Sequence, residues 1–264
     1  MNIIRLGKGN PEIKNLKDLY KKNTSSNLII VEDLNSLNIA LNENLTINKF
    51  FFVDDVEYHK DTKKIINEAT NKAKEAYSFS KNIFDSLSLK ENSIGFIAII
   101  EINTISLNDL KDKKFIVVCD RLETPGNLGT IYRTMDSVCC DAMVLVDPIT
   151  KFNNPLLTLA ARGTNLIIPT CISKYDDAVK YLEDNGYEIY LGEPLLGKDY
   201  KSYDYNGKIA IVVGNERFGI NSDWYNHKSN KVFIPMEGHN NSLNVSVAAS
   251  ILIYEAYMKR RLNK

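Results

Sequence analysis

A glycine-containing segment at residues 125–134 holds the side chains best suited to bind an anion. It reads Pro-Gly-Asn-Leu-Gly-Thr-Ile-Tyr-Arg-Thr and follows an apolar stretch at 115–119. A turn that opens a helix presents free N–H groups to an anion, and Arg133, one to two turns further on, could reach the same anion. A tight turn with a surface arginine is the structural alternative. The segment lacks the G-x-G-x-x-G spacing of a dinucleotide-binding turn.

A second group follows the apolar run at 209–213, where Gly214 and Gly219 flank Asn215 and Glu216. The end of a buried parallel strand is where α/β proteins bind ligands, and glycine lets a ligand approach the backbone closely. Glu216 could orient a substrate hydroxyl or pair with Arg133. A strand, a turn and a structural ion pair would give the same pattern.

The third group lies at 234–245, in the order Ile-Pro-Met-Glu-Gly-His-Asn-Asn-Ser-Leu-Asn-Val. A strand ends at the proline, a polar loop follows, and apolar residues then recur at helical spacing to the end of the chain. Ser242 is a natural N-cap for this last helix, so Ser242 and Asn244 are expected where the N–H groups and the positive end of the helix dipole face outward. A capping role alone would explain Ser242 but not Asn244.

The spacing of apolar residues predicts the elements that position these groups. Strands are expected at 28–31, 50–53, 94–102, 115–119, 142–146, 166–169, 188–191, 209–213 and 232–234, and helices at 11–23, 62–76, 128–138, 175–185 and after Ser242. From residue 114 the strand-then-helix alternation favours an α/β fold with a parallel sheet covered on both faces. The polar stretch at 103–114 is the candidate linker, with a boundary near residue 108.

Charge and composition exclude several classes of protein. Lysine plus arginine equal aspartate plus glutamate at 33 each, so no overall cationic field attracts nucleic acid and any RNA surface must be local. The candidate basic groups, each equally explained as a solvated helix face, are Arg5, Lys8, Lys14, Lys17, Lys21 and Lys22, the stretch 60–74, and the tail residues Lys259, Arg260, Arg261 and Lys264.

Cysteine and histidine usage gives no support for a metal site. The four cysteines show no C-x-x-C spacing and are interpreted as buried hydrophobic residues, and the three histidines are far apart. No apolar run approaches the roughly 18 residues of a membrane span, so we expect a cytoplasmic protein without metal or membrane.

Taken together and in this order, the three groups resemble the motifs of the SpoU, or TrmH-like, RNA 2′-O-ribose methyltransferases of the SPOUT superfamily. The matching residues are Asn127, Gly129, Ile131 and Arg133, then Gly214, Asn215, Glu216 and Gly219, then Ile234, Pro235, Met236 and the run 242–248. Residues 28–33 and 79–98 resemble, more loosely, the ribosomal-protein-like domain that many members carry for RNA binding. Cys139-Cys140-Asp141, the pair Arg217-Phe218 and Asp33 depart from the usual family residues.

The resemblance implies a smaller N-terminal α/β RNA-binding domain at 1–107 and a SPOUT catalytic domain at 108–264 with a parallel sheet and a deep trefoil knot. It implies a homodimer that uses S-adenosyl-L-methionine to methylate RNA, and the separate N-terminal domain favours 23S ribosomal RNA. The implied cofactor-binding residues are Leu191, Gly192, Gly214, Asn215, Ile234, Met236 and Leu243. The implied catalytic residues are Asn127, Arg133, Glu216, Ser242 and Asn244.

The family's catalytic arginine corresponds to Arg133 and has been linked to removal of the ribose 2′-hydroxyl proton. Because a guanidinium stays protonated in proteins, we expect Arg133 to bind the neighbouring phosphate and stabilise the developing alkoxide instead. Glu216 or the substrate phosphate would then accept the proton. In a dimer, Arg133 could serve the cofactor pocket of the other subunit.

Other functions remain open at this point. The substrate could be tRNA, or the methylation could protect ribosomal RNA from an antibiotic. A non-catalytic RNA-binding or assembly protein is disfavoured because Asn127, Arg133, Glu216 and Asn244 are all present. A nucleotide-dependent oxidoreductase is disfavoured because the glycine fingerprint and the acidic residue that ends the second strand of its βαβ unit are both missing.

Overall fold

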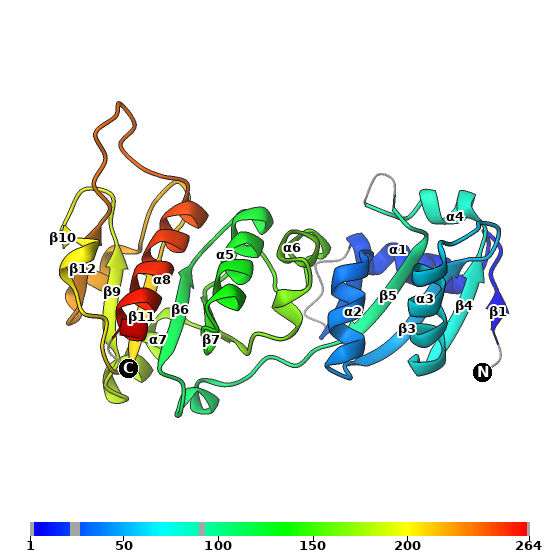
Figure 1. Cartoon of the computed structure of the whole chain (residues 1–264), viewed down its shortest axis with the longest axis horizontal. Helices are drawn as coiled ribbons and strands as arrows, with labels where there is room; N and C mark the ends of the chain where they lie inside the picture. The colour runs from blue at the N-terminus through cyan, green and yellow to red at the C-terminus, as the bar shows by residue number, and fades with distance from the viewer. Residues whose placement is uncertain (1–2, 22–26, 90–92, 263–264) are drawn as a thin grey trace. The chain divides into compact units, whose positions relative to one another are not determined.

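The computed structural model describes residues 3–21, 27–89 and 93–262, and of Lys21 the backbone alone. The chain forms two compact units, one of residues 1–103 with 151–167 and the other of residues 104–150 with 168–264 (Figure 1). This division differs from the single boundary expected near residue 108. Lys22 and Lys264, two of the candidate basic residues, lie outside the described residues, as does the end of the helix expected at 11–23.

The first unit contains a mixed five-stranded sheet in the order β1-β4-β3-β5-β2. Its elements are β1 (Ile4–Arg5), α1 (Pro11–Lys21), β2 (Leu28–Val31), α2 (Leu34–Asn42), β3 (Thr46–Val53), α3 (Lys60–Lys72), β4 (Glu75–Phe79), α4 (Lys81–Asp85), β5 (Phe96–Glu101), α6 (Pro155–Ala161) and the 3₁₀ turn η2 (Thr164–Leu166). β5 pairs antiparallel with β2 and β3, whereas β4 pairs parallel with β1 and β3. Stacked aromatic rings on β3, β4 and β5 fill its core.

Helix α6 packs against β2 of the first unit, although its neighbours in sequence belong to the second. Asn154 caps it by accepting the N–H of Leu156 at 2.9 Å, and Pro155 occupies its first turn. Gly163 follows the helix with a φ of +88°, and a Cβ there would fall 2.6 Å from the Cα of Ser36. Only glycine therefore allows this close approach to α2.

The second unit is built on a seven-stranded sheet in the order β10-β12-β9-β11-β6-β7-β8, in which every pair of neighbours is parallel. Its elements are η1 (Leu107–Leu110), β6 (Phe115–Asp120), α5 (Pro125–Ser137), β7 (Ala142–Val146), β8 (Thr170–Ser173), α7 (Tyr175–Asp184), β9 (Glu188–Gly192), β10 (Lys198–Asp199), η3 (Tyr200–Ser202), β11 (Ile209–Val213), η4 (Ser222–Asn226), β12 (Asn230–Phe233) and α8 (Val245–Leu262). The parallel α/β sheet expected from residue 114 onward is thus present.

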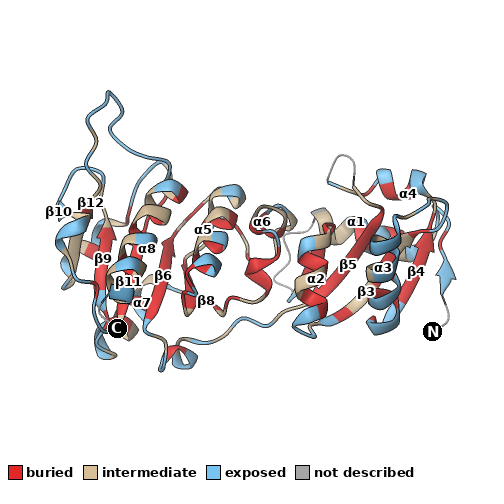
Figure 2. Ribbon diagram, viewed as in Figure 1, coloured by how far each residue is buried: buried red, intermediate tan, exposed pale blue. Residues whose placement is uncertain are grey.

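The central strands β6, β7 and β11 are buried along their whole length, as Figure 2 shows for β6. Helix α7 joins the core on one side of the sheet, and α8 packs against α5, β9 and β11. Because β6, β9 and β11 are adjacent and parallel, the loops that leave them emerge at one edge of the sheet. This arrangement brings the second motif close to the start of the first.

The strand expected at 166–169 was wrong. Those residues form the end of η2 and a connection, and β8 begins only at Thr170, after Pro169. Proline has no N–H to donate to a sheet, and Arg162 and Gly163 both have positive φ, so the apolar residues here pack in a turn. Helices α2 and α6 were not predicted. None of the helices in the described part of the chain combines the length and the apolar character of a membrane span.

Candidate functional site

The loops that follow β6, β9, β11 and β12 surround a cavity of about 880 Å³ in the second unit. The residues expected at a site that line it are Asn127, Gly192, Gly214, Asn215, Glu216, Ile234, Met236, Ser242, Leu243 and Asn244. Apolar side chains from α8, Ala248 and Leu252, complete one wall. Residues from all three motifs therefore share one cavity.

A line of hydrogen bonds joins the three motifs at this cavity. Asn244 donates from Nδ2 to Oδ1 of Asn127 at 3.0 Å, and Asn127 donates from its own Nδ2 to Oε1 of Glu216 at 2.9 Å. The Glu216 carboxylate also accepts the backbone N–H groups of Glu123 and Thr124, each at 3.0 Å. We call this set the Asn244–Asn127–Glu216 relay. It fixes the loop before α5 relative to the loop after β11 and the start of α8.

These bonds give Glu216 a positioning role. Partial burial by itself would raise the pKa of this carboxyl group, but hydrogen bonds from the Glu123 N–H, the Asn127 amide and the Thr124 N–H outweigh it, so the pKa lies below its usual range. Within one chain Glu216 therefore holds the loop before α5, and it makes no ion pair with the exposed Arg133 in the described residues. Its part in accepting the 2′-hydroxyl proton stays a prediction.

Asn215 and Gly214 shape the loop after β11. The Asn215 side chain accepts the N–H groups of Arg217 and Phe218 at 2.9 and 3.1 Å and donates to the carbonyl of Arg121 at 2.8 Å. A Cβ at Gly214 would fall 2.2 Å from the backbone nitrogen of Ile220, so the loop closes only over glycine. Asn215 contributes to the cavity mainly by folding this loop.

The last helix starts two residues later than a Ser242 cap would require. Asn244 accepts the Ser246 N–H at 2.9 Å and the Ser246 hydroxyl at 2.7 Å, so Asn244 is the residue that caps α8. The expectation that Ser242 is the N-cap was wrong. Ser242 is exposed at the cavity wall, and its hydroxyl has no hydrogen bond with the described residues.

Two residues expected at the site lie elsewhere. Leu191 is fully buried in the core cluster that includes Val212 and Trp224, because successive strand side chains alternate between the faces of the sheet, and Leu191 does not line the cavity. Arg133 is exposed on α5, is not among the lining residues and makes no side-chain hydrogen bond or ion pair with the described part of the chain. The cavity of one chain is thus built without this guanidinium.

Several lining residues were not predicted from the sequence. Thr124 ends the loop that Glu216 holds before α5, the Tyr225 hydroxyl donates a hydrogen bond to Glu193, and Phe218 is exposed at the cavity. Burial, together with the hydrogen bond to Glu193, raises the pKa of Tyr225. Only Phe218 carried a signal in the sequence, as part of the unusual Arg217-Phe218 pair.

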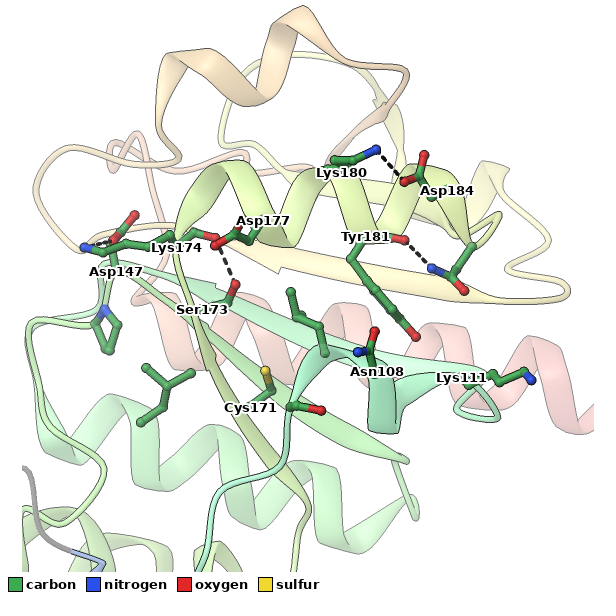
Figure 3. A pocket seen from close by; sticks show the side chains of 15 residues that line it. Asn108, Lys111, Asp147, Cys171, Ser173, Lys174, Asp177, Lys180, Tyr181 and Asp184 are labelled. Atoms are coloured by element: carbon green, nitrogen blue, oxygen red, sulfur yellow. Dashed lines mark hydrogen bonds and ion pairs between the residues drawn. The ribbon is translucent and has the colours of Figure 1, made fainter.

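A larger hollow of about 1190 Å³ lies between β8, α7 and η1, away from the three motifs (Figure 3). Two of its lysines are neutralised by ion pairs, Lys174 with Asp147 at 2.8 Å and Lys180 with Asp184 at 2.7 Å. It contains none of the motif residues, so we place the candidate site at the smaller cavity. Within the described ranges, no three metal-ligating side chains come together.

The fold and this cavity define an α/β domain with a parallel sheet, in which loops at the strand ends, apolar side chains and the Asn244–Asn127–Glu216 relay line one cavity. More particularly, residues 114–254 match the model of the SpoU rRNA Methylase family, which spans more than half of the chain. The chain belongs to this family.

Similar proteins extend over both units. The 23S rRNA (guanosine(2553)-2′-O)-methyltransferase RlmP of Bacillus subtilis is 26% identical over 247 residues, covering 93% of this chain and 95% of that protein. The AdoMet-bound rRNA methyltransferase of Sinorhizobium meliloti has a TM-score of 0.86 at 22% identity over 98% of both chains. AviRb of Streptomyces viridochromogenes, in complex with AdoMet, has a TM-score of 0.85 at 20% identity over 96% of this chain and 98% of its own.

Proposed function

We propose that this chain transfers a methyl group from S-adenosyl-L-methionine to the 2′-oxygen of a ribose in RNA, with 23S ribosomal RNA as substrate. The Asn244–Asn127–Glu216 relay carries the proposal, because it unites at one cavity the residues by which the chain resembles 2′-O-ribose methyltransferases. Similarity to RlmP over both units supports ribosomal RNA in place of tRNA.

The cavity suits this cofactor in size and lining. A volume of about 880 Å³ falls within the roughly 300–1,000 Å³ of small-molecule and cofactor pockets. Ile234, Met236 and Leu243 offer apolar contact to an adenine, and Gly192 and Gly214 leave backbone accessible. When bound, the cofactor supplies an electrophilic methyl group on its sulfonium.

The work of the protein is then to hold the ribose and exclude water. The relay residues present polar atoms on rigid loops, and Ser242 adds a hydroxyl with no partner in the described chain. Arg133 would stabilise negative charge on the 2′-oxygen and bind the adjacent phosphate. Glu216 and the substrate phosphate are the two candidate acceptors for the 2′-hydroxyl proton.

A homodimer would bring Arg133 to a cavity. Helix α8 carries exposed apolar residues at helical spacing, Val247, Tyr254, Met258 and Leu262, which a second copy could cover. Arg133 lies exposed on α5, the helix that packs against α8. We therefore propose that Arg133 of one subunit acts at the cavity of the other.

We further propose that the second unit contains the trefoil knot of the SPOUT superfamily and that the first unit binds RNA. The knot rests on family membership and on α8, which follows β12 yet packs against β9 and β11. RNA binding rests on exposed lysines of the first unit, Lys8, Lys14 and Lys17. Arg260 is a poorer candidate, because it donates to the carbonyls of Tyr205 and Gly207.

Methyl transfer to RNA tests the proposed function. The full chain is incubated with a 23S rRNA transcript and S-adenosyl-L-methionine labelled at the methyl group, and labelled nucleosides are separated after digestion. We expect a 2′-O-methyl nucleoside with the unaltered chain and none with Arg133→Ala, which should still bind the cofactor in calorimetry. Turnover retained by Arg133→Ala would show that this residue is not catalytic. Binding of NAD in place of S-adenosyl-L-methionine would refute the proposed function.

A further inference from the structure

An exposed aromatic ring stands at the cavity without any contact that explains it. Phe218 is 76% exposed, lines the cavity and makes no ring contact with the described residues. Single exposed apolar residues are common on protein surfaces. This one differs because it lines the same cavity as the relay residue Glu216, which lies two positions before it in the sequence.

The backbone that carries this ring is held firmly. The N–H groups of Arg217 and Phe218 both donate to Oδ1 of Asn215, and Asn215 and Gly219 exchange two backbone hydrogen bonds of 3.0 and 2.9 Å. Gly214 lets the loop close against Ile220, as described above. A ring presented on a rigid loop loses little conformational entropy when a ligand covers it.

The neighbouring side chain adds positive charge. Arg217 is 77% exposed, and its ion pair with Glu123 is a long one, 3.8 Å from Nε to Oε2. An exposed aromatic face next to an exposed guanidinium is the combination by which proteins bind unpaired nucleotides, stacking on the base and contacting the phosphate. The loop after β11 is held by Asn215 and Gly219, so its folding requires neither an exposed ring nor an exposed guanidinium.

We propose that Phe218 stacks on an unpaired base of the RNA substrate at the cavity mouth and that Arg217 contacts a phosphate of the same strand. The inference rests on the proposed function and deepens it, because it makes the target nucleotide part of a single-stranded or unstacked region. These two residues would thus help to select the site of methylation, while the relay holds the site's loops in place.

Substitutions at Phe218 test the stacking directly in the full-length protein. Phe218→Ala and Phe218→Leu should lower kcat/KM for the 23S rRNA transcript roughly five- to hundredfold, the range for loss of one stacked base. Phe218→Trp should stay within about threefold of the unaltered chain, because it keeps an aromatic face. Ile172→Ala on β8, an exposed apolar residue outside the cavity, is the matched control and should have no effect.

Three results would overturn the inference. One is an unchanged kcat/KM for RNA in Phe218→Ala. Another is a Kd for S-adenosyl-L-methionine that rises as much as the loss in kcat/KM, which would mean that the ring covers the cofactor. The third is a change of molecular mass in solution, which would mean that the ring contacts a second copy of the chain.

Photocrosslinking separates this inference from the proposed function. The protein is irradiated with the transcript carrying 4-thiouridine, and crosslinked peptides are mapped. We expect a crosslink within residues 214–219 that Phe218→Ala loses; its absence from the unaltered chain refutes the inference whether or not methyl transfer occurs. Methyl transfer without this crosslink would support the proposed function and refute stacking by Phe218. The crosslink without methyl transfer would support stacking by Phe218 and refute the proposed function.

Discussion

Asn127 uses both ends of its amide in the relay, donating to Glu216 and accepting from Asn244. Replacing either asparagine with alanine should cost about 1 kcal/mol of unfolding free energy and lower kcat more than tenfold, because the loops it joins lose their alignment. Since the two residues share one hydrogen bond, the double variant should lose less stability than the sum of the single ones. Urea unfolding of the four proteins measures this coupling.

Asn185 provides the control for this cycle. It lies at the other hollow and bonds the carbonyl of Tyr181 within its own helix end. Asn185→Ala combined with Asn127→Ala should be additive. Additivity between Asn127→Ala and Asn244→Ala as well would contradict the relay.

Glu216 should make stability depend on pH in a defined direction. Its pKa in the folded chain lies below the ordinary value of 4.5, so the unfolded chain binds the proton first and the stabilisation is lost as pH falls through the folded pKa. Glu216→Gln replaces an accepting oxygen with an amide donor and should be less stable than the unaltered chain at neutral pH. The difference should shrink in acid, as measured by urea unfolding from about pH 7 to pH 3. A difference that grows in acid would mean that the pKa is raised.

At this scale the sequence identified residues better than it identified their tasks. The order of the motifs was enough to single out Asn127, Glu216 and Asn244. It could not show that Glu216 is held by the N–H groups of Glu123 and Thr124, because those hydrogen bonds join segments more than ninety positions apart. The cap of α8 was misplaced for a local reason: serine and asparagine are both good N-caps, and spacing alone did not distinguish Ser242 from Asn244.

Among the loops at the strand ends, the one after β11 tolerates little change at its first glycine. Gly214→Ala would place a Cβ 2.2 Å from the nitrogen of Ile220 and 2.3 Å from the carbonyl carbon of Gly219, both backbone atoms that cannot turn aside. We expect a loss of about 2 kcal/mol or more in unfolding free energy and weaker cofactor binding. Thermal unfolding and calorimetry with S-adenosyl-L-methionine measure the two effects.

Gly238 gives a matched control in the loop between β12 and α8. A Cβ there meets nothing within 4 Å and its φ is not positive, so Gly238→Ala should change neither quantity appreciably. Equal losses in the two variants would show that the effect of Gly214→Ala does not come from loop closure.

Elements with regular apolar spacing were predicted well, and those set by caps and turns were not. The buried strands β6, β7 and β11 appear at the expected residues because a strand covered on both faces needs a continuous apolar run. Helix α6 is only seven residues long, which is too short for a helical repeat to stand out among its leucines and alanines, although Asn154 followed by Pro155 was a readable start signal.

In the whole molecule, the position of helix α6 determines how the separate roles of the two units, RNA binding and methyl transfer, can be tested. Its segment, residues 151–167, belongs to the first unit, so deleting residues 1–105 would remove the strand on which it packs and expose its apolar face. No linear boundary could have predicted this, because the association depends on packing between α6 and β2. Charge substitution on the intact chain is the cleaner experiment.

The double variant Lys14→Gln and Lys17→Gln on α1 should weaken RNA binding and reduce the salt dependence of log affinity by roughly one for each phosphate that the protein no longer neutralises. Cofactor affinity should not change, because these side chains belong to the first unit. Lys180→Gln on α7, where the lysine pairs with Asp184, is the control. Filter binding over a range of salt measures the effect; equal losses of RNA and cofactor binding would refute the assignment of RNA binding to the first unit.

Mapping the methylated riboses of cellular RNA is the decisive test of whether this chain methylates a ribose oxygen. Ribosomal and transfer RNA are isolated from cells with the gene, without it, and with the Arg133→Ala form, and every 2′-O-methyl position is mapped. We expect one ribose position in 23S rRNA to be methylated only when the unaltered gene is present. Identical maps in all three strains, or a methyl group lost from a base and not from a ribose, would contradict this expectation.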